Sequence, residues 1–148
     1  MKNRSVRRVV AIDDDWSTLL LFGDIAAAQG WQFTAHTGES LQIEDLVRLE
    51  PDLLIVDLLL TPGPQQLTGR ELLRLIASHH DLHRIPVIVC AGNPAEMRAA
   101  EEELRSMPAV TMLAKPFDIA AMEEAVRRLM VPTDDAPGGP PEAVAQPA

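Results

Sequence analysis

Three groups of charged residues in this chain would support phosphoryl chemistry if folding brought them together. Asp57 ends the apolar run 53–56, Asp13 to Asp15 follow the apolar run 9–12, and Lys115 with Pro116 closes the run 112–114. Clustered carboxylates are the ligands that a hard ion such as Mg²⁺ prefers, and such an ion also neutralises an incoming phosphoryl group. An ammonium can bind a phosphate oxygen as a point charge. The three groups therefore predict one site for a divalent metal and a phosphoryl group.

The elements that would position these residues follow from the hydrophobic pattern. Short β-branched runs alternate with amphipathic stretches, which predicts an α/β fold with a parallel sheet and helices on both faces. The expected strands are 8–12, 32–35, 53–57, 87–91 and 110–114. Apolar residues at helical spacing lie between and after them, so five β/α units result. Gly30 is expected to close the first helix, Pro51 to follow the second, Pro94 to begin the fourth and Asp118 to cap the fifth.

Parallel strands have their carboxyl ends at one edge of the sheet, where ligands of open α/β sheets bind. Asp13, Asp14, Asp57 and Lys115 would all lie at that edge. Carboxylates ~4 Å apart repel by about 4 kcal/mol per pair at an effective dielectric of about 20, so a cation must offset them. The alternative for residues 13–15 alone is an N-terminal helix cap favoured by the helix dipole.

Composition narrows the class of protein. The chain has 148 residues and a formal net charge of −9. This negative charge argues against nucleic acid as a partner. Solubility is the alternative explanation for the excess of Asp and Glu. A lone cysteine, Cys90, fits a reducing compartment. The basic start is followed by too short an apolar run for a signal peptide, and no window is long enough to cross a membrane. A cytoplasmic location is expected, with one folded domain over residues 1–131 and a disordered Pro, Ala and Gly-rich tail over residues 132–148.

Four motifs together resemble the receiver domain of bacterial two-component response regulators. They are Val10-Ala11-Ile12-Asp13-Asp14-Asp15, Pro51-Asp52 leading into Leu54-Ile55-Val56-Asp57, Ile85-Pro86-Val87-Ile88-Val89, and Ala114-Lys115-Pro116-Phe117-Asp118. The resemblance covers roughly residues 6 to 131. It implies a flavodoxin-like fold with strand order 2-1-3-4-5, and a stand-alone phosphoacceptor that signals through a partner rather than an enzyme.

The resemblance also implies a role for individual residues. Asp57 would accept a phosphoryl group from a histidine on a sensor histidine kinase or a histidine phosphotransfer protein. Asp14, Asp57 and the Leu59 carbonyl would bind Mg²⁺ directly, and Asp13 would bind it through water. Lys115 would pair with the phosphoryl oxygen, and Lys115-Pro116 would be a cis peptide. Signals would pass to a downstream protein that the sequence does not identify, and the face of the last two helices is where two receivers usually pair.

The chain departs from the family at two switch positions and in the length of one segment. Ala91 stands where receivers usually carry a Ser or Thr, and Met112 stands where they commonly carry an aromatic residue. The segment from Leu58 to Thr68 is longer than usual and contains Pro62, Gly63 and Pro64. We therefore expect phosphorylation at Asp57 with an atypical conformational response.

Two alternative functions remain open at this stage. The first is a receiver-like interaction module that does not use phosphorylation. The absence of the usual hydroxyl at Ala91 and of the usual aromatic residue at Met112 favours it. The second is a phosphatase with its nucleophile on the first strand, where Asp13 and Asp15 alternate. No glycine-rich turn follows the first strand, which excludes a nicotinamide site of the usual kind.

Other conspicuous residues have ordinary explanations. Trp16 is expected to be partly buried, although an exposed anchor for a kinase is the alternative. His79 and His83 have the spacing of zinc ligands on a helix, but histidines near a helix C-terminus are the simpler interpretation. Cys90 is expected to be buried in a strand, and Glu101 to Glu103 to form a solvated helix face.

Overall fold

A computed structural model describes residues 6–60, 67–105 and 107–129 of the chain. Its five strands are β1 (Arg8–Ile12), β2 (Gln32–His36), β3 (Leu53–Asp57), β4 (Val87–Ala91) and β5 (Val110–Ala114). All pairings are parallel, in the order β2-β1-β3-β4-β5. The predicted fold class is therefore confirmed: this is a doubly wound, flavodoxin-like α/β sheet.

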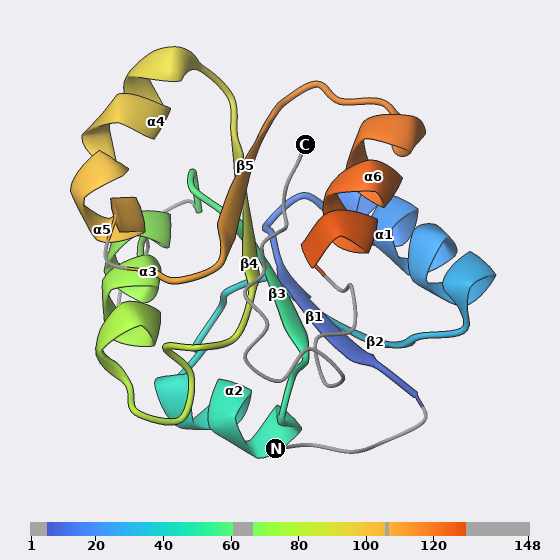
Figure 1. Ribbon diagram of the computed structural model, residues 1–148, viewed down its shortest axis with the longest axis horizontal. Coiled ribbons are helices and arrows are strands. Elements are labelled where there is room, and N and C mark those ends of the chain that lie inside the picture. The colour runs from blue at the N-terminus through green and yellow to red at the C-terminus, as the bar shows by residue number, and fades with distance from the viewer. Residues whose placement is uncertain (1–5, 61–66, 106, 130–148) are drawn as a thin grey trace, which may run out of the picture.

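Helices cover both faces of the sheet (Figure 1). They are α1 (Trp16–Gln29), α2 (Ile43–Leu49), α3 (Gly69–Ser78), α4 (Pro94–Ala99), α5 (Glu101–Arg105) and α6 (Ile119–Leu129). In the figure α1 and α6 lie on one side of the sheet, and α2, α3, α4 and α5 lie on the other. Each expected β/α connection is present, which brings the carboxyl ends of all five strands to one edge.

Alternation of side chains along the strands divides the core into two layers. Val10, Leu54 and Val89 pack into the layer that α3 and α5 cover. Their neighbours Val9, Ile55 and Ile88 pack into the layer under α1 and α6. The central strands β3 and β4 are buried along their whole length. Burial of both faces explains why these strands are continuous apolar runs in the sequence.

The predicted helix boundaries coincide with local signals that the structure contains. Gly30 ends α1 in a left-handed conformation with φ 76°, which glycine adopts without a Cβ clash. Pro94 occupies the first turn of α4. The Asp118 carboxylate accepts the Ala121 N–H at 2.7 Å at the start of α6. Each of these signals is satisfied by residues within a few positions.

The fourth unit differs from the expected single helix because it contains two short ones. Ala100 lies between α4 and α5 with φ −95° and ψ 5°, outside the helical region. Its N–H donates to the carbonyls of Glu96 and Met97 at 3.2 and 3.3 Å, and its side chain is completely buried. This backbone turn redirects the chain, so that α5 packs against α3.

Two sequence predictions fall outside the described residues. They are the disordered tail over 132–148 and the middle of the long segment after Asp57, with Pro62, Gly63 and Pro64. Of the helices within the described ranges, none combines the length and apolar character that a membrane span requires.

Candidate functional site

The carboxyl edge of the sheet gathers the charged residues that the sequence singled out. Asp13 directly follows β1, Asp57 is the last residue of β3, and Lys115 directly follows β5. Strands β1 and β3 are neighbours, and the chain leaves them for opposite faces of the sheet. The acidic residues therefore lie at the topological switch point, the place where open α/β sheets bind ligands.

Backbone contacts hold Asp13 and Lys115 at this edge. The Asp13 N–H donates to the His36 carbonyl at 3.0 Å, and the Lys115 N–H donates to the Ala91 carbonyl at 2.7 Å. Beyond Pro116, the Phe117 ring stacks on Phe22 of α1 with 5.9 Å between centroids. The Lys115–Pro116 peptide is cis. Hydrogen bonds at two strand ends and one ring stack thus hold the backbone on both sides of the site, including that of Lys115.

Lys115 joins two buried carboxylates. Its Nζ lies 3.0 Å from Asp13 Oδ2 and 3.4 Å from Asp57 Oδ1. The Asp13 residue is 1% exposed and Asp57 is 4% exposed. Buried charges are normally paired and hydrogen-bonded, and this pair of contacts meets that requirement for the ammonium.

The donor set suits a hard divalent ion. Carboxylate oxygens of Asp13, Asp14 and Asp57 lie within 4.8 Å of one another. With Lys115 beside them, the ionised cluster retains two negative charges, and its ligands are oxygens only, as Mg²⁺ prefers. Both oxygens of Asp13 already accept hydrogen bonds: Oδ1 from the Asp15 N–H at 2.9 Å and Oδ2 from Lys115. The predicted role of Asp13, a contact with the ion through water, is compatible with these hydrogen bonds.

Burial and neighbouring charge shift the acid–base properties of the site. Burial, reinforced by the Asp13 carboxylate, raises the pKa of Asp57 to about 6, although Lys115 opposes the rise. Burial acts to lower the pKa of Lys115, but the Asp13 hydrogen bond and the charge of Asp57 outweigh it and the pKa is raised. Lys115 is therefore charged at neutral pH. The Asp57 carboxyl group keeps its proton to a higher pH than an ordinary aspartate does.

The acidic run 13–15 divides between the two roles weighed from the sequence. Asp15 is the N-cap of α1, where its side chain accepts the Ser17 N–H at 3.2 Å and the Ser17 hydroxyl at 2.8 Å. These hydrogen bonds lower the pKa of Asp15. Asp13 and Asp14 instead join the cluster with Asp57. The helix-cap interpretation thus holds for Asp15 alone.

The backbone after Asp57 turns back toward its carboxylate. The Leu59 N–H donates to Asp57 Oδ1 at 3.2 Å, and the Leu59 side chain is 55% exposed. The proposed metal contact of the Leu59 carbonyl stays a prediction. At the neighbouring strand ends, Ala91 is completely buried and Met112 packs against the core layer under α3. Neither side chain can supply the hydroxyl or the aromatic ring that receivers usually carry there.

Trp16 lies beside the site and its side chain points into solvent. The prediction of partial burial was wrong, because the residue is 60% exposed. Leu20, one helical turn further along α1, is 66% exposed. The buried stripe of α1 consists of Leu19, Phe22, Ile25 and Ala26, so these two side chains belong to the opposite face.

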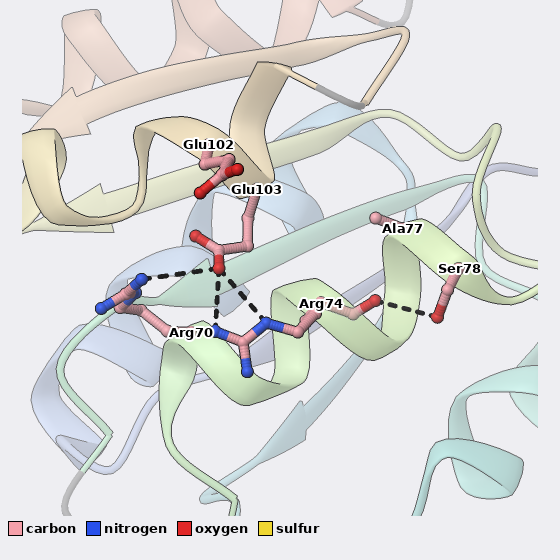
Figure 2. Close-up of a pocket in the computed structure, with 6 residues that line it drawn as sticks. All are labelled: Arg70, Arg74, Ala77, Ser78, Glu102 and Glu103. Atoms are coloured by element: carbon pink, nitrogen blue, oxygen red, sulfur yellow. Dashed lines mark hydrogen bonds and ion pairs between the residues drawn. The ribbon is translucent and has the colours of Figure 1, made fainter.

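A second charged cluster lies between α3 and α5 and was missed in the sequence. Glu103 Oε2 lies 2.8 Å from Arg74 Nη2 and 3.5 Å from Arg70 Nη2. Figure 2 shows both arginine side chains directed at this carboxylate. The Glu103 side chain is only 9% exposed, so the prediction of a solvated face was wrong for it. Hydrogen bonds from Arg74 lower the pKa of Glu103. The surrounding hollow is lined also by Ala77, Ser78 and Glu102, and its two arginines pair with Glu103.

The histidines of the α3–β4 connection do not share a helix face. His79 is the C-cap of α3, and His83 lies beyond the helix end. His79, His80 and Asp81 offer ligand atoms within 4.8 Å of one another. However, His79 Nδ1 accepts the Asp81 N–H at 3.1 Å, so the proton of the neutral ring is on Nε2. A metal would have to displace that proton or break that hydrogen bond.

Comparison with solved structures identifies the fold. A chemotaxis response regulator, CheY4 of Vibrio cholerae, superposes with a TM-score of 0.72 over 85% of this chain and 100% of its own, at 16% identity. A signal receiver domain of a histidine kinase from Syntrophus aciditrophicus gives 0.72 over 95% and 98%, at 20% identity. A receiver domain of a sensor histidine kinase from Pseudomonas aeruginosa, described with magnesium in its active site cleft, gives 0.67 over 84% and 98%, at 18% identity.

No protein-family model matches the sequence, and no curated protein matches it either. At identities of 16–20% the structural likeness establishes the fold and not the activity. The chain has the fold of response-regulator receiver domains, and its acidic cluster lies at the ligand-binding edge of that fold.

Proposed function

We propose that this protein is a phosphoacceptor receiver of a two-component system, which accepts a phosphoryl group on Asp57 in a magnesium-dependent reaction. The single observation that carries the proposal is the joint placement of Asp57, Asp13, Asp14 and Lys115 at the switch point of the sheet. A structural ion pair would need one carboxylate beside Lys115. Two carboxylates on one ammonium, with a third carboxylate within 4.8 Å of both, are better explained by a site that receives a cation and a phosphoryl group.

The chemistry required of the chain is limited to positioning and electrostatics. We assign the attack to Asp57 Oδ2, because Oδ1 accepts the Leu59 N–H and faces Lys115. Oδ2 forms a bond to phosphorus as the bond from phosphorus to the donor breaks, and the electron pair of that bond leaves with the donor. The product is an acyl phosphate, whose charge Lys115 is placed to stabilise. In this proposal the reaction modifies the Asp57 side chain of the protein itself. The protein therefore acts as a signalling component and not as an enzyme that converts a separate substrate.

The bound metal would supply positive charge against the phosphoryl oxygens. Asp14 and Asp57 are the proposed direct ligands, together with the Leu59 carbonyl, and Asp13 is proposed to act through water. The fit rests on the oxygen-only donor set and on the existing hydrogen bonds of Asp13. The magnesium described for the Pseudomonas aeruginosa receiver is consistent with this proposal.

The proposed donor is a phosphohistidine on a sensor histidine kinase or a histidine phosphotransfer protein. Exposed apolar side chains around the acidic edge, Trp16 and Leu20 on α1 and Ile119 at the start of α6, support contact with a protein rather than a small molecule alone. The downstream protein and any pairing of two receivers remain predictions from the resemblance.

The test is phosphorylation by a small donor. Wild-type protein incubated with acetyl phosphate and Mg²⁺ is expected to gain one phosphoryl mass in intact-protein mass spectrometry, and Asp57→Asn protein is expected to gain none. An equal gain by the Asp57→Asn protein would refute the assignment of the acceptor.

A receiver-like module that works without phosphorylation is the second candidate. The specific observation that favours it is the replacement of both switch positions by Ala91 and Met112, neither of which can respond as the usual residues do. Absence of any adduct on a wild-type protein that binds Mg²⁺ would favour this candidate.

A further inference from the structure

The peptide N–H of Gly92 is a hydrogen-bond donor at the phosphoacceptor edge. In a parallel strand the N–H and carbonyl of one residue point to one neighbour, and those of the next residue point to the other. The Cys90 carbonyl accepts the Leu58 N–H on the β3 side at 2.8 Å, and the Ala91 carbonyl accepts the Lys115 N–H on the β5 side at 2.7 Å. Continuing this alternation turns the Gly92 N–H toward β3, the strand that ends in Asp57.

A phosphoryl group on Asp57 would reach this donor. Strand β4 lies between β3 and β5, and Asp57 is paired with Cys90 while Ala91 is paired with Ala114. A phosphoryl group that bridges Asp57 and Lys115 must therefore extend over the end of β4. Gly92 directly follows β4, and the backbone there is open, since an added Cβ would meet only Glu96 Oε1 at 3.7 Å.

In this structure the donor is occupied by a carboxylate. Glu96 Oε1 accepts the Gly92 N–H at 2.9 Å, and Glu96 Oε2 accepts Asn93 Nδ2 at 3.2 Å. Glu96 is the third residue of α4, whose N-cap is Asn93. In an ordinary capping box this side chain would bond the N–H of the N-cap residue. Here it reaches one residue further back, to the end of β4.

We propose that the Glu96 carboxylate occupies, in the unphosphorylated protein, the Gly92 N–H that a phosphoryl group on Asp57 would take, and that phosphorylation displaces it. The proposal rests on the phosphoacceptor function proposed above. Both acceptors are anions and compete for one donor. Displacement removes the bond between Glu96 and the end of β4, and so changes the start of α4. Glu96 thus gives this protein a side chain that changes position on phosphorylation, although Ala91 has no hydroxyl that could do so.

The experiment compares Glu96→Gln with wild type and with Glu50→Gln as a matched control. Glu50 pairs with Arg8 at the amino end of β1, the opposite end of the sheet, so its variant removes the same charge away from the site. Loss of the Glu96 charge should raise the initial rate of Asp57 phosphorylation by acetyl phosphate about two- to fivefold, the effect of one nearby, partly screened charge on a dianion. Glu50→Gln should match wild type.

The second measurement follows the Gly92 amide directly by ¹H–¹⁵N NMR of the full chain. Adding Mg²⁺ and beryllium fluoride, a phosphoryl mimic, should shift the Gly92 resonance of wild type. Without the mimic, the Glu96→Gln protein should already differ from wild type at this amide. A role limited to capping α4 would lower thermal stability in Glu96→Gln but leave the phosphorylation rate and the response of the Gly92 amide unchanged.

The two proposals fail in distinguishable ways. If wild type forms an Asp57 adduct, but Glu96→Gln forms it at the same rate and the Gly92 amide does not respond to beryllium fluoride, only the role of Glu96 is overturned. If wild type forms no adduct and no amide at this edge responds to the mimic, the phosphoacceptor function falls and the role of Glu96 falls with it.

Discussion

At the scale of single residues, the environment of Asp57 lowers the stability of the folded protein when this residue is ionised. A carboxylate at the end of a fully buried strand loses hydration, and the Asp13 charge next to it adds repulsion. Lys115 offsets part of this energy through contacts with both carboxylates. Ionised Asp57 therefore lowers the free energy of unfolding of the metal-free protein.

The first prediction concerns Asp57→Asn in EDTA. The folded protein binds the Asp57 proton more tightly than the unfolded chain, because the pKa rises from 3.8 to about 6. Stability from this group is therefore complete below pH 3.8 and is lost as the pH rises through about 6. Asp57→Asn should be more stable than wild type at pH 8, by about 1–3 kcal/mol.

Urea unfolding at pH 8, 6 and 4 measures this gap, which should shrink as the pH falls. Asp24→Asn, a substitution at an exposed position of α1, serves as the control and should show no comparable gap. A constant difference between Asp57→Asn and wild type across this range would contradict the account of Asp57.

At the scale of elements, the start of α3 must approach the end of β3 very closely. A Cβ added to Gly69 would lie 2.3 Å from the Leu58 carbonyl oxygen and 2.6 Å from that of Asp57. These are backbone atoms, so they cannot move aside without moving Asp57. The glycine is therefore required by packing at the site.

The second prediction compares Gly69→Ala with Gly23→Ala. The first should lower the free energy of unfolding by about 2–4 kcal/mol, in the range of severe overpacking, and should also slow phosphorylation of Asp57. At Gly23 a Cβ meets only the Phe33 ring at 3.5 Å, so alanine in this helix should be neutral or stabilising by up to about 1 kcal/mol. Equal stability of the two variants would show that the contact between α3 and β3 relaxes easily.

The contact between α3 and α5 depends on Glu103 and its two arginines, so the third prediction concerns Glu103→Gln. This variant should lose about 1–2 kcal/mol of stability at pH 7, as expected when a shielded charge-assisted contact is weakened. Glu102→Gln, at an exposed neighbour that lines the same hollow, should change stability little (Figure 2).

The pH dependence of the Glu103 contribution has the opposite sign from that of Asp57. Because the pKa of Glu103 is lowered, its contribution is present above its ordinary value of 4.5 and is lost as the pH falls through the folded pKa. Thermal unfolding of wild type and Glu103→Gln between pH 7 and pH 3 measures this, and the two proteins should converge in acid. A gap that persists at pH 3 would assign the effect to packing.

The sequence predicted the features that depend on neighbours along the chain. Four of the five strands, the end of α1 at Gly30 and the cap at Asp118 lie where they were expected, and β2 runs one residue further than expected, to His36. The contact of Glu103 with Arg74 joins residues 29 positions apart, and no local pattern distinguishes Glu103 from the two glutamates before it. The division of the fourth helix at Ala100 likewise depends on how α5 packs against α3.

The candidate site was predictable as a set of residues but not in its contacts. Parallel strands place Asp13, Asp57 and Lys115 at one edge whatever the side-chain details. Which of the three adjacent aspartates caps α1 depends on one backbone conformation, that of Asp15 with φ −101° and ψ 110°. The contact of Glu96 with Gly92 departs from the usual capping register, so spacing rules could not reveal it.

At the scale of the whole molecule, the acidic edge should couple metal binding to folding. The fourth prediction is that Mg²⁺ raises the melting temperature, because an ion that binds only the folded state stabilises it by about 2.7 kcal/mol at 100 times its Kd. The increase should be larger at pH 8 than at pH 5, since protons compete with the metal for Asp57 below about pH 6. Asp14→Asn should remove most of it in differential scanning calorimetry. An equal increase in Asp14→Asn would place the ion elsewhere.

The most direct test of the central claim locates the phosphoryl group on the chain. Protein treated with acetyl phosphate and Mg²⁺ is reduced with borohydride, which converts an aspartyl phosphate to homoserine, and its peptides are analysed by mass spectrometry. Homoserine is expected at Asp57 only, and none is expected when EDTA replaces Mg²⁺. Homoserine at Asp13 instead would indicate a nucleophile on the first strand, and homoserine at neither position would contradict a phosphoacceptor function.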